Sequence, residues 1–96
     1  MLPTKRVSTH PGELLKRLYL DEMGITQVAF AKHTGMSLQR LNELINGKRG
    51  VTAETAWLLA QALGVSPQFW MNAQAMHDLT KNRPAKKIPQ IKARAA

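Results

Sequence analysis

Cysteine is absent from this 96-residue chain, and its three histidines lie far apart in the sequence. The absence of cysteine excludes disulfides and thiolate chemistry. The histidines lack the short spacing of a metal site, so no metal ion is expected. No pair of carboxylates, no Ser/His/Asp group and no glycine-rich phosphate loop can be read from the sequence. We therefore expect no catalytic residues and no cofactor, in a protein that is not an enzyme.

Long apolar segments are absent as well. No run approaches the about 20 residues that are needed to cross a bilayer. No apolar segment follows the charged residues near the N-terminus, as it would in a signal peptide. We therefore expect a cytoplasmic protein without a membrane partner.

Acidic residues are missing from the C-terminal end of the chain. Residues 1–80 carry eight Lys and Arg against six Asp and Glu, whereas residues 81–96 carry six Lys and Arg and no acid. Such a basic segment favours a polyanion, chiefly nucleic acid, although it can also serve only as a solubilising end. Two prolines and no sustained apolar pattern predict that residues 81–96 are disordered. Residues 1–8 are expected to form a flexible arm.

Five capped helical patterns occupy the stretch between these ends, from about residue 9 to residue 80. Residues suited to cap a helix precede the last four patterns, at Thr26, Ser37, Thr52 and Ser66. Thr9 or His10 is expected to cap the first helix. The patterns predict an all-α domain with no strand. The apolar positions expected on the core side of the first three helices are Leu14, Leu15, Leu18, Met23, Val28, Phe30, Ala31, Leu38, Leu41, Leu44 and Ile45, although Val28 and Phe30 cannot both point the same way.

The chain is organised around residues 27–44. Ala31 is small where a second backbone must come close, Gly35 supplies the positive φ that ends a helix, and Ser37 can cap the next helix. This order predicts a helix-turn-helix, in which the second helix enters the major groove of DNA. We therefore expect a DNA-binding protein.

The exposed side of this second helix is expected to read bases, through Ser37, Leu38, Gln39, Arg40 and Glu43. Gln39 can bond an adenine with two hydrogen bonds. Arg40 can bond a guanine or hold a phosphate, and Glu43 can accept from a cytosine amine or remain solvated. The hydroxyl of Ser37 is expected to cap the helix by accepting a backbone hydrogen bond. Leu38 either touches a thymine methyl or packs inward.

A second group of polar residues suits contacts to phosphate: Gln27, Asn42, Asn46, Lys48 and Arg49. Gln27 begins the first helix of the unit, where backbone N–H groups also point outward. Asn46, Lys48 and Arg49 lie where the chain leaves the reading helix. For Lys48 and Arg49 the alternative is an ordinary solvated turn.

The last two helices carry more apolar surface than one small core covers. Trp57 and Leu58 are adjacent and cannot both face inward, and the segment 67–79 is apolar on more than one face. This surplus predicts a two-fold dimer, since two reading helices about 34 Å apart match a palindromic site. The alternative is that all of these residues belong to the monomer core. The expected interface residues are Trp57, Leu58, Phe69, Trp70, Ala73 and Met76.

Several short motifs are more specific than the helix-turn-helix itself. They are HPGE at 10–13, GITQ at 24–27, NGKRG at 46–50, TAETA at 52–56 and FWMNAQ at 69–74, followed by Asp78-Leu79. Together they resemble the HigA/VapI-type antitoxins, which are helix-turn-helix proteins of the Xre class related to phage Cro and C1 repressors. The resemblance implies a compact five-helix, Cro/C1-type (lambda repressor-like) domain at residues 9–80, with a C-terminal dimerisation helix and flexible termini.

The resemblance also implies two activities. Proteins of this kind bind and neutralise a toxin, commonly a HigB/RelE-like mRNA endonuclease, in a type II toxin–antitoxin system of bacteria. They also bind the operator of their own operon as homodimers and repress it, which would associate them with the nucleoid. The alternative is a stand-alone Xre-family transcriptional regulator without a cognate toxin.

Overall fold

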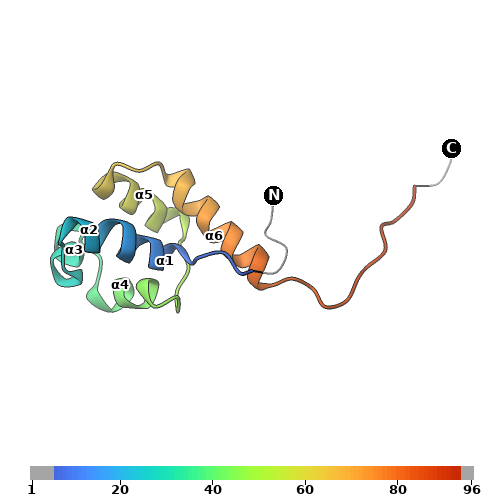
Figure 1. Cartoon of the computed structure of the whole chain (residues 1–96). Helices are drawn as coiled ribbons and strands as arrows, with labels where there is room; N and C mark the ends of the chain where they lie inside the picture. Colours follow the sequence, from blue (N-terminus) through green and yellow to red (C-terminus); the bar gives the residue numbers. More distant parts are fainter. Residues whose placement is uncertain (1–5, 94–96) are drawn as a thin grey trace.

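The computed structural model describes residues 6–93, and these residues form helices and no strand (Figure 1). The first helix runs without a break through α1 (Pro11–Leu14), the π-helical segment η1 (Leu15–Leu20) and α2 (Asp21–Met23). It is followed by α3 (Gln27–Thr34), α4 (Leu38–Ile45), α5 (Ala53–Leu63) and α6 (Pro67–Lys81). The all-α helix-turn-helix fold predicted from the sequence is therefore confirmed.

Local sequence chemistry accounts for where the helices begin and end. The ring of His10 accepts a hydrogen bond from the Gly12 backbone N–H at 2.9 Å and so caps the first helix. The hydroxyls of Thr26, Ser37, Thr52 and Ser66 accept backbone hydrogen bonds at the starts of the other four helices. Gly35 ends α3 with a φ of 80°, a left-handed conformation that favours glycine.

The π-helical segment changes which side of the first helix is buried. The Asp21 backbone N–H donates to the Lys16 carbonyl, five positions earlier. This wider turn puts Leu15 and Leu20 on one side, where their exposures are 0% and 2%. Leu18 and Met23 are instead exposed, at 53% and 55%. Their predicted burial is wrong, because the prediction assumed an α-helical period throughout this helix.

Two further apolar predictions in the helix-turn-helix are corrected. Val28 is 63% exposed, while Phe30 and Ala31 of the same helix are buried. Leu38 is 47% exposed and does not pack inward, whereas the other apolar residues of α4, namely Leu41, Leu44 and Ile45, are buried. Val28 and Leu38 are each in the first turn of their helix, α3 and α4, on the side that faces away from the core.

Trp70 of α6 fills the centre of the molecule, with no exposed surface. Its ring lies 5.5 Å from that of Tyr19 and 4.9 Å from that of Phe69, between centroids. Leu15, Leu41 and Leu59, from three other helices, are equally buried in the same cluster. The placement of Trp70 at a dimer interface is therefore incorrect, because its side chain is already covered within one chain.

Close packing of α1 on α4 depends on Gly12. A β-carbon at this residue would stand 1.7 Å from the Leu44 carbonyl oxygen, so only glycine allows the two backbones to come so near. The contact fixes α4 against the start of the first helix. It explains the structural purpose of the glycine in the HPGE motif.

The C-terminal segment lies outside this helical body. Residues 83–93 form no helix or strand and are exposed throughout, and they trail away from the end of α6 (Figure 1). Within residues 6–93, no helix combines the length and apolarity that crossing a bilayer requires. Residues 1–5 of the predicted arm and 94–96 of the predicted tail lie outside the described residues.

Candidate nucleic-acid interface

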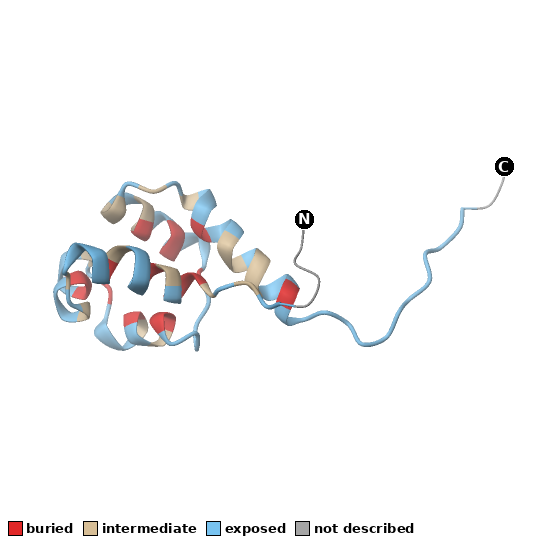
Figure 2. Cartoon of the chain, viewed as in Figure 1, coloured by how far each residue is buried: buried red, intermediate tan, exposed pale blue. Residues whose placement is uncertain are grey.

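One side of α4 is turned to solvent along its length. Leu41, Leu44 and Ile45 are buried in the core, whereas Leu38, Gln39 and Asn42 are exposed, and Figure 2 shows this mixture of buried and exposed positions along the helix. The two sides follow from helical periodicity, since apolar residues recur at intervals of three and four. Ser37 caps the helix through the Arg40 backbone N–H at 3.1 Å, as expected.

Arg40 is drawn away from this solvent-facing side. Its guanidinium donates to the Thr55 hydroxyl at 2.7 Å and contacts the Glu54 carboxylate at 3.4 Å, both on α5. The Arg40 side chain is only 28% exposed, and Thr55 is buried. These contacts do not fit a side chain held ready for a guanine or a phosphate. Through these contacts, the Arg40 side chain links α4 to α5.

Glu43 is also engaged within the protein. Its carboxylate accepts from the Arg49 guanidinium at 3.0 Å. The Lys48 backbone N–H donates to the Glu43 carbonyl at 2.8 Å. These two bonds tie the turn after α4 to the helix itself, and they place Lys48 and Arg49 beside its end. Both basic residues remain exposed.

A row of amide side chains crosses from α3 to the end of α4. The Asn42 amide donates to the Gln27 side-chain oxygen at 3.4 Å. The Asn46 amide donates to the Asn42 side-chain oxygen at 3.1 Å. The structure thus brings together three residues predicted to contact phosphate, from the start of one helix and the end of the next.

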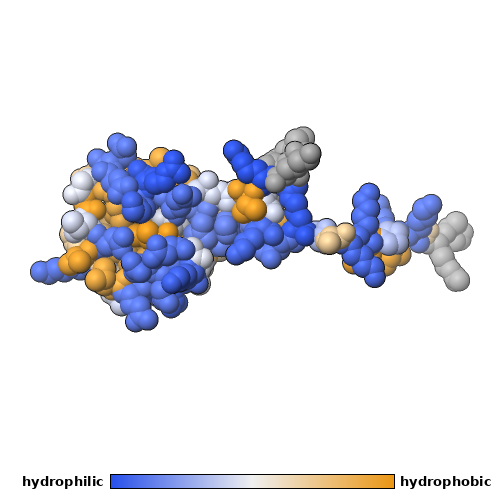
Figure 3. Space-filling model, turned by 60° about the horizontal axis from the view of Figure 1, so that its bottom comes forward, coloured by the Kyte–Doolittle hydropathy of each residue, from blue (hydrophilic) through white to orange (hydrophobic). Residues whose placement is uncertain are grey.

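The face of the molecule that carries α4 is mainly hydrophilic. Figure 3, in which this side comes forward, shows hydrophobic surface only in patches among the polar atoms of the helical body. Val28 and Leu38 are the large apolar side chains exposed on α3 and α4. The face therefore combines polar groups with a few apolar contacts, as a surface that reads base edges in a groove requires.

The predicted pairing residues do not form one continuous patch. Trp57 is 58% exposed and, with Met71, lines a groove between α5 and α6. Leu58 is half-buried and lines a different hollow, with His33 and Thr34 of α3. Phe69 is 37% exposed, and Ala73 and Met76 are half-buried. Of the expected set, Trp57 has the largest uncovered apolar surface.

Two residues that support the interface, Thr55 and Gln74, were not predicted from the sequence. Thr55 holds Arg40, as described above. Gln74 of α6 accepts from the Val51 backbone N–H at 2.7 Å and so fixes the loop that follows the Asn46–Arg49 turn. Helical spacing could have indicated both residues. Thr55 lies three positions after the cap residue Thr52, and Gln74 lies four positions after the core residue Trp70, so each is on a side of its helix that faces inward.

The described residues contain no group of three or more His, Asp or Glu side chains that could hold a metal ion. The interface is thus built of amides, hydroxyls, basic side chains and backbone groups, all of which suit contacts to a nucleic acid.

Known proteins that are similar to this chain in sequence include helix-turn-helix proteins and an antitoxin. A family model described as helix-turn-helix matches residues 15–70. Antitoxin HigA-1 of Vibrio cholerae serotype O1 is 46% identical over 86 residues, which cover 86% of this chain and 80% of the relative. Virulence-associated protein I of Dichelobacter nodosus is 43% identical over 70 residues, which cover 73% of this chain and 65% of the relative.

Solved structures give the same result. PA4674 of Pseudomonas aeruginosa, in complex with its operator DNA, is similar with a TM-score of 0.79 and 32% identity, over 88% of this chain and 89% of that chain. The Pseudomonas aeruginosa antitoxin HigA, solved with the higBA promoter, has a TM-score of 0.75 and 34% identity, over 79% and 82% of the two chains.

Fold and surface define a DNA-binding protein of the helix-turn-helix class. Within that class, the chain belongs to the HigA/VapI-type antitoxins. The family assignment suggested by the HPGE, NGKRG and FWMNAQ motifs is confirmed.

Proposed function

We propose that this protein neutralises a HigB/RelE-like mRNA endonuclease by direct binding and represses its own operon as a homodimer on a palindromic operator. The observation that carries the proposal is the solvent-facing side of α4, bordered by the Gln27–Asn42–Asn46 row of amides and by Lys48 and Arg49. Its membership of an antitoxin family supports the toxin as a second partner. The protein acts in the bacterial cytoplasm.

The contacts described above narrow the residues proposed to read bases. Leu38 and Gln39 are exposed at the N-terminal end of α4, the end that meets base edges. Glu43 reads a base only if it exchanges its bond to Arg49 for one to DNA. The Ser37 hydroxyl caps α4, and the Arg40 guanidinium is bonded to Thr55 of α5. Neither of these two residues is proposed as a reader.

The residues proposed to hold phosphates remain Gln27, Asn42, Asn46, Lys48 and Arg49. Each is polar or basic, and the row of amides spans the distance between two helices. Phosphate contacts of this kind fix the register of the protein on the duplex and carry no sequence information themselves. The base contacts at Leu38 and Gln39 would supply the specificity.

The homodimer is proposed to form through the α5 and α6 side of the molecule. Trp57, more than half exposed, is the proposed anchor, and Phe69, Ala73 and Met76 are further proposed contacts that lie outside the Trp57 groove. Burying such apolar surface is the main driving force of association. The domain that pairs is proposed as residues 9–80, with residues 1–8 as an arm whose last residue, Ser8, bonds to Thr80, and residues 81–96 as a tail that begins at the last residue of α6.

Co-expression with the product of the neighbouring gene tests the proposal. Growth arrest by that product should be relieved by the wild-type protein, and the two should co-purify. Gln39→Ala is the matched control, because loss of a base contact should weaken repression and leave neutralisation intact. A neighbouring product that causes no arrest, or arrest that the protein does not relieve, would favour the stand-alone regulator.

A further inference from the structure

The basic tail, residues 81–96, carries most of the net positive charge of the chain. Its six Lys and Arg face no acid within the segment. Lys81 is the last residue of α6, whereas Lys86, Lys87 and Lys92 are exposed in the segment 83–93, which forms no helix or strand. We propose that this tail binds the phosphate backbone of DNA beside the operator half-site. The inference rests on the proposed function, since it places the tail on the same DNA.

The start of the tail is linked to the turn that follows α4 through the residues before the first helix. Thr80, buried at the end of α6, accepts from the Ser8 backbone N–H at 2.8 Å. His77 lies 2.8 Å from the Ser8 carbonyl through its Nδ1. Because a carbonyl oxygen can only accept, His77 must donate from that nitrogen. The chain just before the first helix is thus held on the end of α6.

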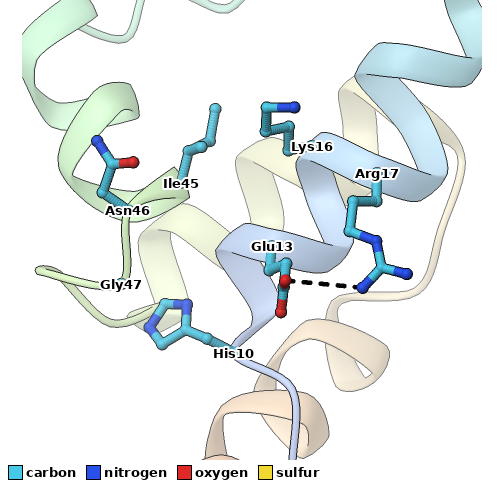
Figure 4. A pocket seen from close by; sticks show the side chains of 7 residues that line it. All are labelled: His10, Glu13, Lys16, Arg17, Ile45, Asn46 and Gly47. Atoms are coloured by element: carbon cyan, nitrogen blue, oxygen red, sulfur yellow. Dashed lines mark ion pairs between the residues drawn. The ribbon is translucent and has the colours of Figure 1, made fainter.

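The same chain segment contacts the end of α4. The rings of His77 and His10 meet edge to face at 4.8 Å. The other side of His10 faces Gly47, 3.9 Å from where a β-carbon of that residue would stand. Figure 4 shows His10, Asn46 and Gly47 around one hollow, with Lys16 on its far side. The end of α6, from which the tail leaves the body, is therefore connected through His77 and His10 to the turn that carries Lys48 and Arg49.

The length of the tail suits this position. Lys92 lies eleven positions after Lys81, and an extended chain advances about 3.3 Å per position. The tail can therefore span about 36 Å, or roughly one turn of duplex DNA. Pro84 and Pro89 favour an extended chain over a helix. Starting from the end of α6, the lysines can follow the backbone beyond the half-site.

The composition favours DNA over a protein groove. All charges in the tail have one sign, as a polyanion requires, and its apolar residues Ile88 and Ile91 are separated rather than clustered. These two side chains are 85% and 91% exposed. A protein groove would take up the isoleucines, whereas a duplex would engage the lysines. The two kinds of partner therefore depend on different residues of the same segment.

The test compares two variants of the full-length protein. One carries Lys86→Gln, Lys87→Gln and Lys92→Gln, and the other carries Ile88→Ser and Ile91→Ser. Each is titrated at several salt concentrations against a duplex containing the operator with about ten base pairs of flank on each side, and against a scrambled duplex of equal length. Toxin binding by both variants is measured in parallel by co-purification.

The lysine variant should lose about 2.7 from the salt slope per protomer, since each phosphate contact contributes about 0.9. The part of the wild-type advantage that each tail contributes should then shrink about 40-fold between 50 and 200 mM salt. The isoleucine variant should behave as wild type. Removal of the flanks should weaken the wild-type protein more than the lysine variant.

An unchanged salt slope in the lysine variant overturns the tail proposal. Loss of toxin binding by the isoleucine variant, with DNA binding intact in both variants, would assign the tail to a protein partner and also overturn it. The proposed function fails separately. If the wild-type protein binds both duplexes equally while the lysine variant binds both more weakly, the tail contacts DNA but the operator-reading function does not hold.

Discussion

Leu38 is an apolar residue at the start of α4, the helix proposed to read bases, and it is nearly half exposed. In a major groove the group that such a side chain can contact is a thymine methyl. Burying one methyl is worth about 0.8 kcal/mol, or roughly fourfold in affinity. We expect that replacing one particular operator thymine by uracil, which lacks the methyl, weakens wild-type binding by about fourfold.

The Leu38→Ala variant should show no such loss at that position. Val28→Ala is the control, because Val28 is exposed on α3 and should not alter the response to uracil at the same base. Titration of a series of operators with single uracil replacements gives the measurement. A series in which no thymine depends on Leu38 would count against its role in reading DNA.

We expect Arg40 to act through its contacts to α5 rather than through DNA. Its bond to the buried Thr55 involves a charged donor, for which about 1.5–3 kcal/mol is typical. The exposed Glu54 adds little. We expect Arg40→Ala to lower the free energy of unfolding by about 1–3 kcal/mol. It should also weaken binding to all operator variants by a similar factor, because the orientation of α4 changes.

Urea unfolding and a panel of operators with single base-pair changes measure both effects. Arg40→Lys should rescue only part of the stability, since an ammonium lacks the fork of the guanidinium. Specific loss of discrimination at a single G·C pair, with unchanged stability, would instead restore Arg40 as a base reader.

His10 makes the stability of the domain depend on pH. Burial lowers the pKa of His10 and the neighbouring His77 lowers it further, while Asp78 and Glu13 oppose this and Lys81 adds to it. The Gly12 N–H bond to its Nδ1 also requires that this nitrogen carry no proton. The unfolded chain therefore binds a proton more readily than the folded chain does. Stability is full above the ordinary histidine pKa of about 6.5 and falls as the pH drops below it.

The His10→Asn variant separates this effect from the other titrating groups. Asparagine can still cap the helix but does not titrate. Unfolding in urea at pH 7.5 and pH 5.5 should show a smaller loss of stability in the variant than in the wild-type protein. Equal losses in both proteins would show that His10 does not control the pH dependence.

At the scale of helices, the boundaries were predictable because they depend on neighbouring residues in the chain. Thr26, Ser37, Thr52 and Ser66 cap as expected, and Gly24, Gly35 and Gly64 adopt positive φ. The π-helical segment was not predictable, since nothing in LKRLYL at 15–20 signals a wider turn. This one difference exposes Leu18 and buries Leu20.

The contact between α1 and α4 gives a prediction at the same scale. A methyl group at residue 12 collides with the backbone of α4, which cannot move aside as a side chain would. Gly12→Ala should therefore cost about 1–3 kcal/mol or more in unfolding free energy. Gly24→Ala is the control. It meets no atom within 4 Å and should lose only the about 1 kcal/mol due to its left-handed conformation. Thermal unfolding that ranks Gly24→Ala as the worse variant would contradict the close approach.

At the scale of the whole molecule, the sequence predicted the class of protein better than the use of individual side chains. The motifs of residues 9–80 are local patterns, and they led to the correct family. Arg40, Glu43 and Trp70 were harder to place because their partners lie on other helices or in the following turn. Pairing of such distant residues depends on tertiary packing, which helical periodicity alone does not specify.

The central claim is that α4 reads the operator of the protein's own operon as part of a two-fold dimer. Hydroxyl-radical footprinting on the DNA upstream of the operon tests it most directly. We expect two equivalent protected windows whose centres lie one helical turn, about 34 Å, or a whole number of turns apart. Both windows should weaken together in Gln39→Ala. Uniform protection along the DNA, or a single window unaffected by Gln39→Ala, would contradict the claim.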